Sequence, residues 1–216
     1  MAQKPMENAR AFIRANLRLE AAPGVPEIRL YRAHAQSGLG RFVGDSASPD
    51  SPPYWAHTWA GGTVLARHIL THPDTVRGRR ILDLGCGSGI VAIAAGLSGA
   101  ASVTAADIDP NAIAATELNA DANGVTLAML LADVLDGPPP ACDFILAGDT
   151  FYDPALARRV TTALDRWGVP TLVGDMGRTP LPLDRLDPVA RYDVPDFGQP
   201  HPMPATVFRF RLKQSA

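Results

Sequence analysis

The second half of the chain carries short apolar runs separated by longer stretches in which apolar residues have helical spacing. Short apolar runs are typical of buried strands, and strands joined by single helices form a parallel sheet with right-handed crossovers. The last two runs lack a helix between them, which predicts an antiparallel hairpin at the edge of the sheet. The predicted strands are residues 81–84, 101–108, 126–131, 143–147, 171–174, 189–194 and 205–212.

Local signals fix where the helices between these strands begin and end. Asp109 and Asp153 are good N-cap residues, and each precedes a proline, which suits the first position of a helix. Asn123 and Gly124 end one of these helices, because glycine readily adopts the left-handed conformation that closes a helix. Helices are therefore predicted over residues 90–97, 110–123 and 154–167, and from about residue 62 to just before Pro73.

The N-terminal part of the chain follows no such alternation. Residues 5–20 have the spacing of a moderately amphipathic helix, and Glu27–Ala33 alternates apolar and polar residues as a short strand does. Residues 44–53 are rich in proline, serine and aspartate, which predicts a loop. We therefore expect an N-terminal appendage over residues 1–53 and a larger domain over residues 54–216.

The whole pattern predicts an α/β fold with a doubly wound, mostly parallel seven-stranded sheet and an antiparallel edge hairpin. A chain of 216 residues with 46% hydrophobic and 19% charged residues has the composition of a globular protein with a full core. Its formal net charge of −2 argues against capture of nucleic acid by broad electrostatic attraction. The sequence has no run of 18 or more apolar residues, which argues against a membrane span.

Cysteine and histidine usage gives no indication of a metal centre. Cys86 and Cys142 are too few for a disulfide framework or for a zinc site of their own. The five histidines are scattered, without the spacing of metal ligands. We therefore expect a reduced, cytoplasmic and monomeric protein that holds no metal.

A glycine-rich segment follows the strand at residues 81–84, with Gly85, Gly87 and Gly89 at alternate positions and a carboxylate at Asp83. Such glycines let the backbone turn sharply and approach a ligand closely at the start of a helix. The dinucleotide fingerprint has the different spacing G-x-G-x-x-G and usually lacks this carboxylate. A carboxylate here would repel a pyrophosphate, and it suits a ligand that carries a cationic amine.

The ends of the next two strands carry further carboxylates. Asp107 is placed to accept hydrogen bonds from both hydroxyls of a ribose, and Ile108 beside it could pack against a base. Asp133, followed by Val134, could accept a hydrogen bond from the exocyclic amine of adenine. The set fits a nucleoside with an attached amino acid and no phosphate, and S-adenosylmethionine is such a ligand.

This combination resembles the class I, seven-strand methyltransferases over roughly residues 55–213. Taken singly, Asp107 and Asp133 could be ordinary turn residues at strand ends, but together with the glycine segment they are a specific signal. The resemblance implies S-adenosylmethionine as the cofactor. The residues that we expect to contact it are Trp59, Asp83, Gly85, Gly87, Gly89, Asp107, Ile108, Asp133, Val134 and Gly148.

The segment after the strand at residues 143–147 narrows the resemblance. Amide and DNA-base methyltransferases carry N/D-P-P-Y/F there, whereas this chain has no proline between Asp149 and Tyr152. An Asp-x-x-Tyr quartet resembles the protein lysine methyltransferases of this fold. Together with Pro53-Tyr54-Trp55-Ala56 and Trp59-Ala60-Gly61-Gly62, it resembles the lysine methyltransferases of the electron-transfer flavoprotein β subunit, although that family has Trp-Pro where this chain has Trp59-Ala60.

The resemblance implies methyl transfer to a lysine ε-amine of a partner protein, the electron-transfer flavoprotein β subunit. Asp149 would position the incoming ammonium or the cofactor's amine, because an unpaired carboxylate would raise the pKa of a lysine that must lose a proton. Tyr152 would line the lysine channel. In the simpler interpretation, Asp149 caps the following helix, Tyr152 is a core aromatic, and Trp59 is a hydrophobic anchor for the N-terminal segment.

Other functions share parts of this pattern. A small-molecule N-methyltransferase of the nicotinamide or amine type would share all of the predicted cofactor-binding residues. A ribosomal-protein methyltransferase is a close cousin, and the lack of a long additional substrate-binding domain argues against it. A non-catalytic scaffold is a third alternative, and the joint presence of Asp83, Asp107, Asp133 and Asp149 argues against it.

Overall fold

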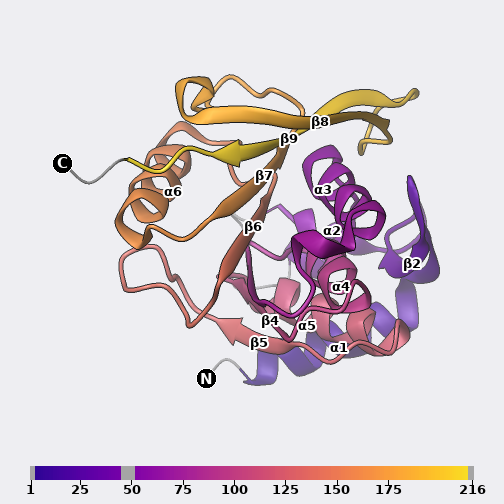
Figure 1. Ribbon diagram of the computed structural model, residues 1–216. Helices are drawn as coiled ribbons and strands as arrows, with labels where there is room; N and C mark the ends of the chain where they lie inside the picture. Colours follow the sequence, from indigo (N-terminus) through magenta and orange to yellow (C-terminus); the bar gives the residue numbers. More distant parts are fainter. Residues whose placement is uncertain (1–2, 45–51, 214–216) are drawn as a thin grey trace.

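The computed structural model describes residues 3–44 and 52–213, and its centre is a seven-stranded sheet (Figure 1). Most of the predicted loop over residues 44–53 lies outside the described residues. The strand order is β5-β4-β3-β6-β7-β9-β8. The strands are β3 (Arg80–Leu84), β4 (Ser102–Asp107), β5 (Ala128–Leu131), β6 (Phe144–Gly148), β7 (Thr171–Asp175), β8 (Leu186–Val194) and β9 (Met203–Phe210).

This topology confirms the predicted fold class. The pairs from β5 through β7 are parallel, and β9 runs antiparallel to both of its neighbours. From β3 the chain proceeds first to β4 on one side and later to β6 on the other. The crevice at such a reversal point, beyond the carboxyl ends of the strands, is where open α/β sheets bind their ligands.

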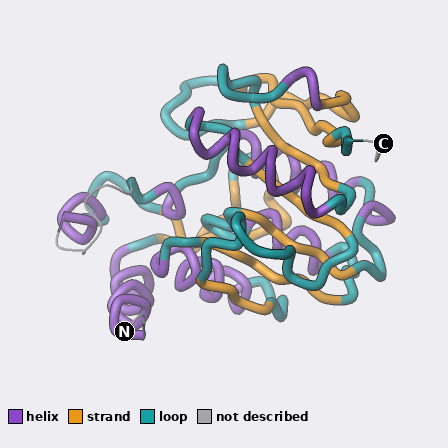
Figure 2. The backbone as a smooth tube through the Cα atoms, turned by 90° about the vertical axis from the view of Figure 1, so that its left-hand side faces the viewer, coloured by secondary structure: helices purple, strands orange, loops and turns teal. Residues whose placement is uncertain are grey.

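Alternate residues of each strand enter two separate cores, one on each face of the sheet. Ile81 and Leu146 belong to the first core, whereas their neighbours Leu82 and Ile145 belong to the second. Three helices cover the first face and one covers the second (Figures 1 and 2). These helices are α3 (Ala60–Thr71), α4 (Ile90–Leu97) and α5 (Pro110–Ala122) on the first face, and α6 (Pro154–Trp167) on the second.

The predicted helix starts are confirmed. The Asp109 carboxylate accepts the Asn111 N–H at 2.8 Å, and the Asp153 carboxylate accepts two N–H groups of α6 at 2.9 Å each. Each cap satisfies backbone donors that have no partner within their own helix. Gly168 ends α6 in the left-handed conformation, with a φ of 63°.

The N-terminal prediction was partly wrong. The first helix, α1 (Gln3–Asn16), ends four residues earlier than expected, and β1 (Arg18–Ala22) takes the remainder of the predicted helix. This strand pairs antiparallel with β2 (Val25–Arg32), which corresponds to the predicted strand. β1 is a strand because it pairs with β2, which lies beyond the turn at Gly24. The spacing of apolar residues up to residue 20 could not reveal this pairing.

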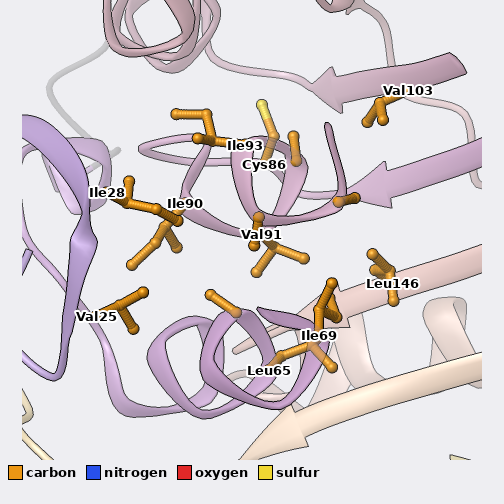
Figure 3. Packing of buried hydrophobic residues seen from close by; sticks show 14 of the residues in the cluster. Val25, Ile28, Leu65, Ile69, Cys86, Ile90, Val91, Ile93, Val103 and Leu146 are labelled. Atoms are coloured by element: carbon orange, nitrogen blue, oxygen red, sulfur yellow. The ribbon is translucent and has the colours of Figure 1, made fainter. Parts of the chain in front are cut away.

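The N-terminal elements pack against the rest of the molecule. Ile13 and Leu17 share a hydrophobic cluster with Leu118 of α5. The side chains of Asn119 and Asn123 accept backbone N–H groups of β2 at 2.7 and 2.9 Å. Figure 3 shows side chains of β2, α3 and α4 meeting in the first core. A short helix that the sequence did not predict, α2 (Leu39–Gly44), follows β2.

Among the described residues, no helix combines the length and the apolar composition that crossing a bilayer would require.

The first turn of α3 lies unusually close to the sheet. A Cβ atom added to Gly174 of β7 would lie 2.1 Å from the carbonyl oxygen of Gly61, and one added to Gly148 of β6 would lie 2.9 Å from the Cα of Gly62. Only glycine allows this approach, because any side chain would push the helix away from the strand ends.

We expect Gly174→Ala to lower the free energy of unfolding by about 1–3 kcal/mol, because the added methyl group overpacks a backbone contact that cannot yield. Urea denaturation of the purified protein measures this change. Gly40→Ala is the matched control, since no atom lies within 4 Å of its Cβ position. Equal unfolding midpoints for the two variants would contradict the prediction.

Candidate methyl-transfer site

A cavity of about 290 Å³ opens at the carboxyl edge of the sheet, at the reversal point between β4, β3 and β6. Every predicted site residue except Gly89 lines it. The tertiary structure therefore brings together residues from five separate stretches of sequence. The predicted residues in the lining are Trp59, Asp83, Gly85, Gly87, Asp107, Ile108, Asp133, Val134, Gly148, Asp149 and Tyr152.

The glycine loop leaves room for a ligand at one position in particular. Gly87 has a φ of 52°, and no atom lies within 4 Å of the place where its Cβ would be. Gly85 also has a positive φ, of 71°, and its N–H donates to the Ala106 carbonyl. Because the loop backbone faces open space at Gly87, a ligand can approach it directly.

Gly89 serves packing and does not line the cavity. It has a φ of 81° and begins α4, and a Cβ there would lie 2.7 Å from the Thr116 methyl group of α5. The neighbouring Cys86 thiol lies 3.3 Å from the Thr116 hydroxyl, and burial raises the pKa of this thiol. Cys86 and Cys142 are both free. A buried, protonated thiol is a poor nucleophile, in agreement with a structural role for Cys86.

Asp83 lies beneath the glycine loop and is 1% exposed. One of its carboxylate oxygens accepts the Ala92 N–H at 3.0 Å, in the first turn of α4. Burial raises the pKa of Asp83 from 3.8 to about 7. The carboxylate therefore anchors the helix that follows the loop, while it also forms part of the cavity wall.

Asp107 is held in a fixed orientation at the end of β4. One carboxylate oxygen accepts the Gly87 N–H at 3.0 Å and the other accepts the Asp109 N–H at 2.9 Å. Each oxygen has a second lone pair for a further donor. Burial raises the pKa of Asp107. Beside it, the Ile108 side chain is 71% exposed, which leaves an apolar surface uncovered at the cavity.

Asp133 has a partner that the sequence did not indicate. Arg159 of α6 donates to it at 2.8 Å and to Asp136 at 3.0 Å. The hydrogen bond from Arg159 lowers the pKa of Asp133, so this carboxylate is ionised at neutral pH. Its other oxygen accepts the Leu135 N–H at 3.1 Å, which fixes the side chain at the cavity wall.

Asp149 connects four parts of the structure. Its own N–H donates to the Gly174 carbonyl, and its carboxylate accepts the Gly61 and Gly62 N–H groups at 3.1 and 2.6 Å. Arg178 donates to the same carboxylate at 2.6 Å. Its φ of 54° is the only positive φ of a non-glycine residue among the described residues. The prediction that Asp149 caps the helix that follows it was wrong. Its carboxylate accepts N–H groups at the start of α3, and Asp153 caps α6.

Burial raises the pKa of Asp149 from 3.8 to about 6, although Arg178 and the Gly62 N–H act in the opposite direction. Its side chain is only 16% exposed. The Arg178 guanidinium pairs with Asp149 at 2.6 Å and also contacts the buried Asp175 at 3.4 Å. Asp149 is thus a paired carboxylate at neutral pH.

Arg178 and Asp196 are two further residues of the site that local sequence patterns did not predict. Arg178 follows β7 and pairs with both Asp149 and the buried Asp175. Asp196, in the loop between β8 and β9, accepts the Ala60 N–H at 2.8 Å. Two carboxylates from distant segments therefore hold the first three N–H groups of α3. No local signal could have found them, because neither residue is near α3 in sequence.

Aromatic side chains surround the cavity on the side of α3. The Tyr54 and Trp59 rings lie 5.6 Å apart, and the Tyr54 and Tyr152 rings lie 5.4 Å apart. The Trp59 indole donates to the Tyr54 carbonyl at 2.9 Å. His57 stacks on Phe197 with ring centroids 3.7 Å apart. Tyr152 is 48% exposed, so the interpretation of Tyr152 as a buried core aromatic is wrong.

The lining of the cavity carries more negative than positive groups. Its carboxylates outnumber its guanidinium groups, and no lysine lines it. Such a cavity attracts a cationic ligand and repels a phosphate. The carboxylates are Asp83, Asp107, Asp109, Asp133 and Asp149, and the guanidinium groups are Arg159 and Arg178.

The sequence of this chain is similar to those of known methyltransferases. Residues 63–148 match the family model described as "Ribosomal protein L11 methyltransferase (PrmA)". A Xenopus laevis protein named "Electron transfer flavoprotein beta subunit lysine methyltransferase" is 38% identical over 196 residues, which cover 87% of this chain and 79% of that protein. The chain belongs to the electron transfer flavoprotein beta subunit lysine methyltransferase family.

Other members of this family match over shorter stretches. The Danio rerio member is 44% identical over 135 residues, which cover 60% of this chain and 52% of that protein. This chain thus spans about half the length of that relative. The Caenorhabditis elegans homolog is 34% identical over 175 residues, which cover 72% of this chain and 71% of that protein.

Solved structures of this fold include methyltransferases crystallised with ligands. A Thermus thermophilus 16S rRNA methyltransferase, solved with AdoMet and guanosine, has a TM-score of 0.54 at 16% identity and covers 72% of this chain and 44% of its own. A Salinibacter ruber RNA methyltransferase, solved with S-adenosyl-L-homocysteine, has a TM-score of 0.52 at 19% identity and covers 71% of this chain and 93% of its own. At these identities the likeness establishes the fold alone.

Proposed function

We propose that this protein uses S-adenosylmethionine to methylate a lysine ε-amine of a partner protein, and that this partner is the electron-transfer flavoprotein β subunit. Membership of the family supports the reaction and the partner. The observation that carries the proposal is the carboxylate-lined cavity at the reversal point of the sheet, which the glycine loop borders with an open backbone at Gly87.

The residues present fit the cofactor. Asp107 keeps free lone pairs on both oxygens, as a ribose diol requires, and Ile108 offers an exposed apolar surface for the base. Asp133 and Val134 would flank the exocyclic amine and the ring of adenine. The open backbone at Gly87 allows close approach of the methionine part, and Gly85 lines the cavity beside it. When bound, S-adenosylmethionine supplies a methyl group on a sulfonium, activated for transfer to an amine.

We assign Asp149 to positioning. Its hydrogen bonds to Gly61, Gly62 and Arg178 hold the start of α3 against β6 and β7, at the wall of the cavity. Trp59 immediately precedes α3 and lines the cavity, and we assign it to the methionine end of the cofactor. Holding reacting groups in one geometry is a large part of what such an enzyme contributes.

The pairing of Asp149 also suits the protonation state of the acceptor. A lysine of ordinary pKa, about 10.4, needs about 4–5 kcal/mol to lose its proton at pH 7. An unpaired carboxylate nearby would increase this cost. Because Arg178 balances Asp149, the carboxylate stabilises the ammonium form less, while the half-buried Tyr152 ring partly removes the amine from water.

The test is methylation of purified electron-transfer flavoprotein β subunit by this protein with S-adenosylmethionine, read by mass spectrometry of the intact subunit and its peptides. We expect methyl groups on lysine and equivalent release of S-adenosylhomocysteine. Nicotinamide and a panel of small amines form the second arm. Transfer to a small amine with none to the protein would favour the small-molecule alternative, and transfer to no acceptor would favour a scaffold.

A further inference from the structure

Exposed apolar side chains gather around the mouth of the cavity. Tyr54, Ile108 and Tyr152 all line it, with exposed fractions of 41, 71 and 48%. Phe197, 48% exposed, stacks on His57, which also belongs to the lining. Exposed apolar groups that cluster at one opening mark a binding surface more often than singly scattered ones do.

Three aromatic rings of the cavity lining contact one another in sequence and form a surface that we call the aromatic lip: Tyr54, Trp59 and Tyr152. Tyr54 stands in the middle, tilted by 55° against Tyr152 and by 76° against Trp59. It lies on the short 3₁₀ helix η1 (Tyr54–Ala56), whereas Tyr152 follows β6. The hydrogen bond from the Trp59 indole to the Tyr54 carbonyl links η1 to the residue that precedes α3.

Charge and aromatic surface coincide at this mouth. Carboxylates predominate in the cavity below the lip, so a positively charged group is drawn towards it. The faces of aromatic rings also attract cations, and they pack well against methylene groups. A chain of methylene groups that ends in an ammonium matches both properties.

We propose that the aromatic lip is the entry site for the alkylammonium side chain of the acceptor, and that Tyr54 is the ring that distinguishes a cationic side chain from a neutral one of the same shape. The inference rests on the proposed function, which requires a lysine acceptor. It adds Tyr54 as a specificity-determining residue and states how the acceptor is selected.

The test uses the full chain alone and a probe of defined chemistry. Nα-acetyl-trimethyllysine amide is titrated against its neutral isostere, in which carbon replaces the ε-nitrogen, and binding is followed by NMR. We expect the cationic probe to bind about threefold or more tightly than the isostere, as a cation–π contact predicts. Tyr54→Phe should keep this preference because it keeps the ring. Tyr54→Leu should reduce this preference to what the carboxylates of the cavity provide, while leaving the affinity for the isostere unchanged.

Leu183→Ala is the control, since Leu183 is 65% exposed and does not line the cavity. Equal binding of the two probes to the natural protein, or a preference in Tyr54→Leu as large as in the natural protein, would overturn the inference. Kinetics give a second readout: Tyr54→Leu should raise KM for the protein acceptor and leave the affinity for S-adenosylmethionine unchanged. Failure of the natural protein to methylate the flavoprotein subunit would count against the proposed function, whereas the probe titration decides the inference by itself.

Discussion

Asp107→Ala is expected to lower the affinity for S-adenosylmethionine by about a hundredfold or more. The carboxylate is oriented by the Gly87 and Asp109 N–H groups, and we propose that both of its oxygens accept hydrogen bonds from the ribose. Each hydrogen bond to a charged group contributes about 1.5–3 kcal/mol, so losing two reaches this factor. The glycine loop also loses the acceptor of its Gly87 N–H, which adds to the effect. Isothermal titration with S-adenosylhomocysteine measures the change.

Two further variants make this result specific. Asp107→Asn keeps the size of the side chain but replaces one acceptor by a donor, so an intermediate loss is expected. Asp74→Ala removes a carboxylate that is 90% exposed and outside the cavity lining, and it should leave binding unchanged. If Asp107→Ala bound as tightly as the natural protein, the assignment of the cavity to a nucleoside would have to be abandoned.

Asp149→Asn is expected to lower kcat by about a hundredfold while the affinity for the cofactor changes little. The amide carries no charge to balance the Arg178 guanidinium, and its NH2 group replaces one of the two oxygens that accept from Gly61, Gly62 and Arg178. The start of α3 then shifts relative to the strand ends. Misplacement of about 1 Å can cost a factor of about 100 in rate. Single-turnover methyl transfer, together with titration of the cofactor, separates the two effects.

The pH dependence gives a second test of Asp149. Its pKa is about 6 in the folded protein against 3.8 as its ordinary value, so the ionised form predominates only above pH 6. Activity should therefore fall as the pH is lowered through about 6. The raised pKa also means that the folded state binds this proton more tightly than the unfolded state. The contribution of Asp149 to stability is therefore lost as the pH rises from about 3.8 to about 6.

Over this range the contribution of Asp149 to activity should rise with pH while its contribution to stability falls. Asp149→Asn should remove these two contributions and leave the pH dependence that comes from the raised pKa of Asp83. Asp165→Asn is the matched control, because Asp165 forms a similarly buried pair with Arg185 outside the cavity lining. Thermal melting over the same pH range gives the stability profile. A natural enzyme whose rate is constant from pH 5 to pH 7 would contradict an essential ionised Asp149.

Local sequence determined much of the architecture. Apolar runs gave the strands of the sheet, since alternate residues must enter the cores on its two faces. Asp109 and Asp153 fixed the starts of α5 and α6, because a cap needs only its own neighbouring N–H groups. The glycine segment and the carboxylates at strand ends could be read in the same way. Parallel strands place their carboxyl ends at one edge, so these residues had to meet.

The tertiary structure alone decided which partners these groups have. The sequence could name Asp149 as a site residue, but its contacts with the start of α3 and with Arg178 join residues from three distant segments. Tyr54 became a site residue only because η1 carries its ring to Tyr152. β1 could not be distinguished from a helix until β2 was available to pair with it. Short-range patterns specify whether a segment is a helix or a strand and which of its faces is buried. Ion pairs and aromatic contacts depend on distances between remote segments, which only the folded chain sets.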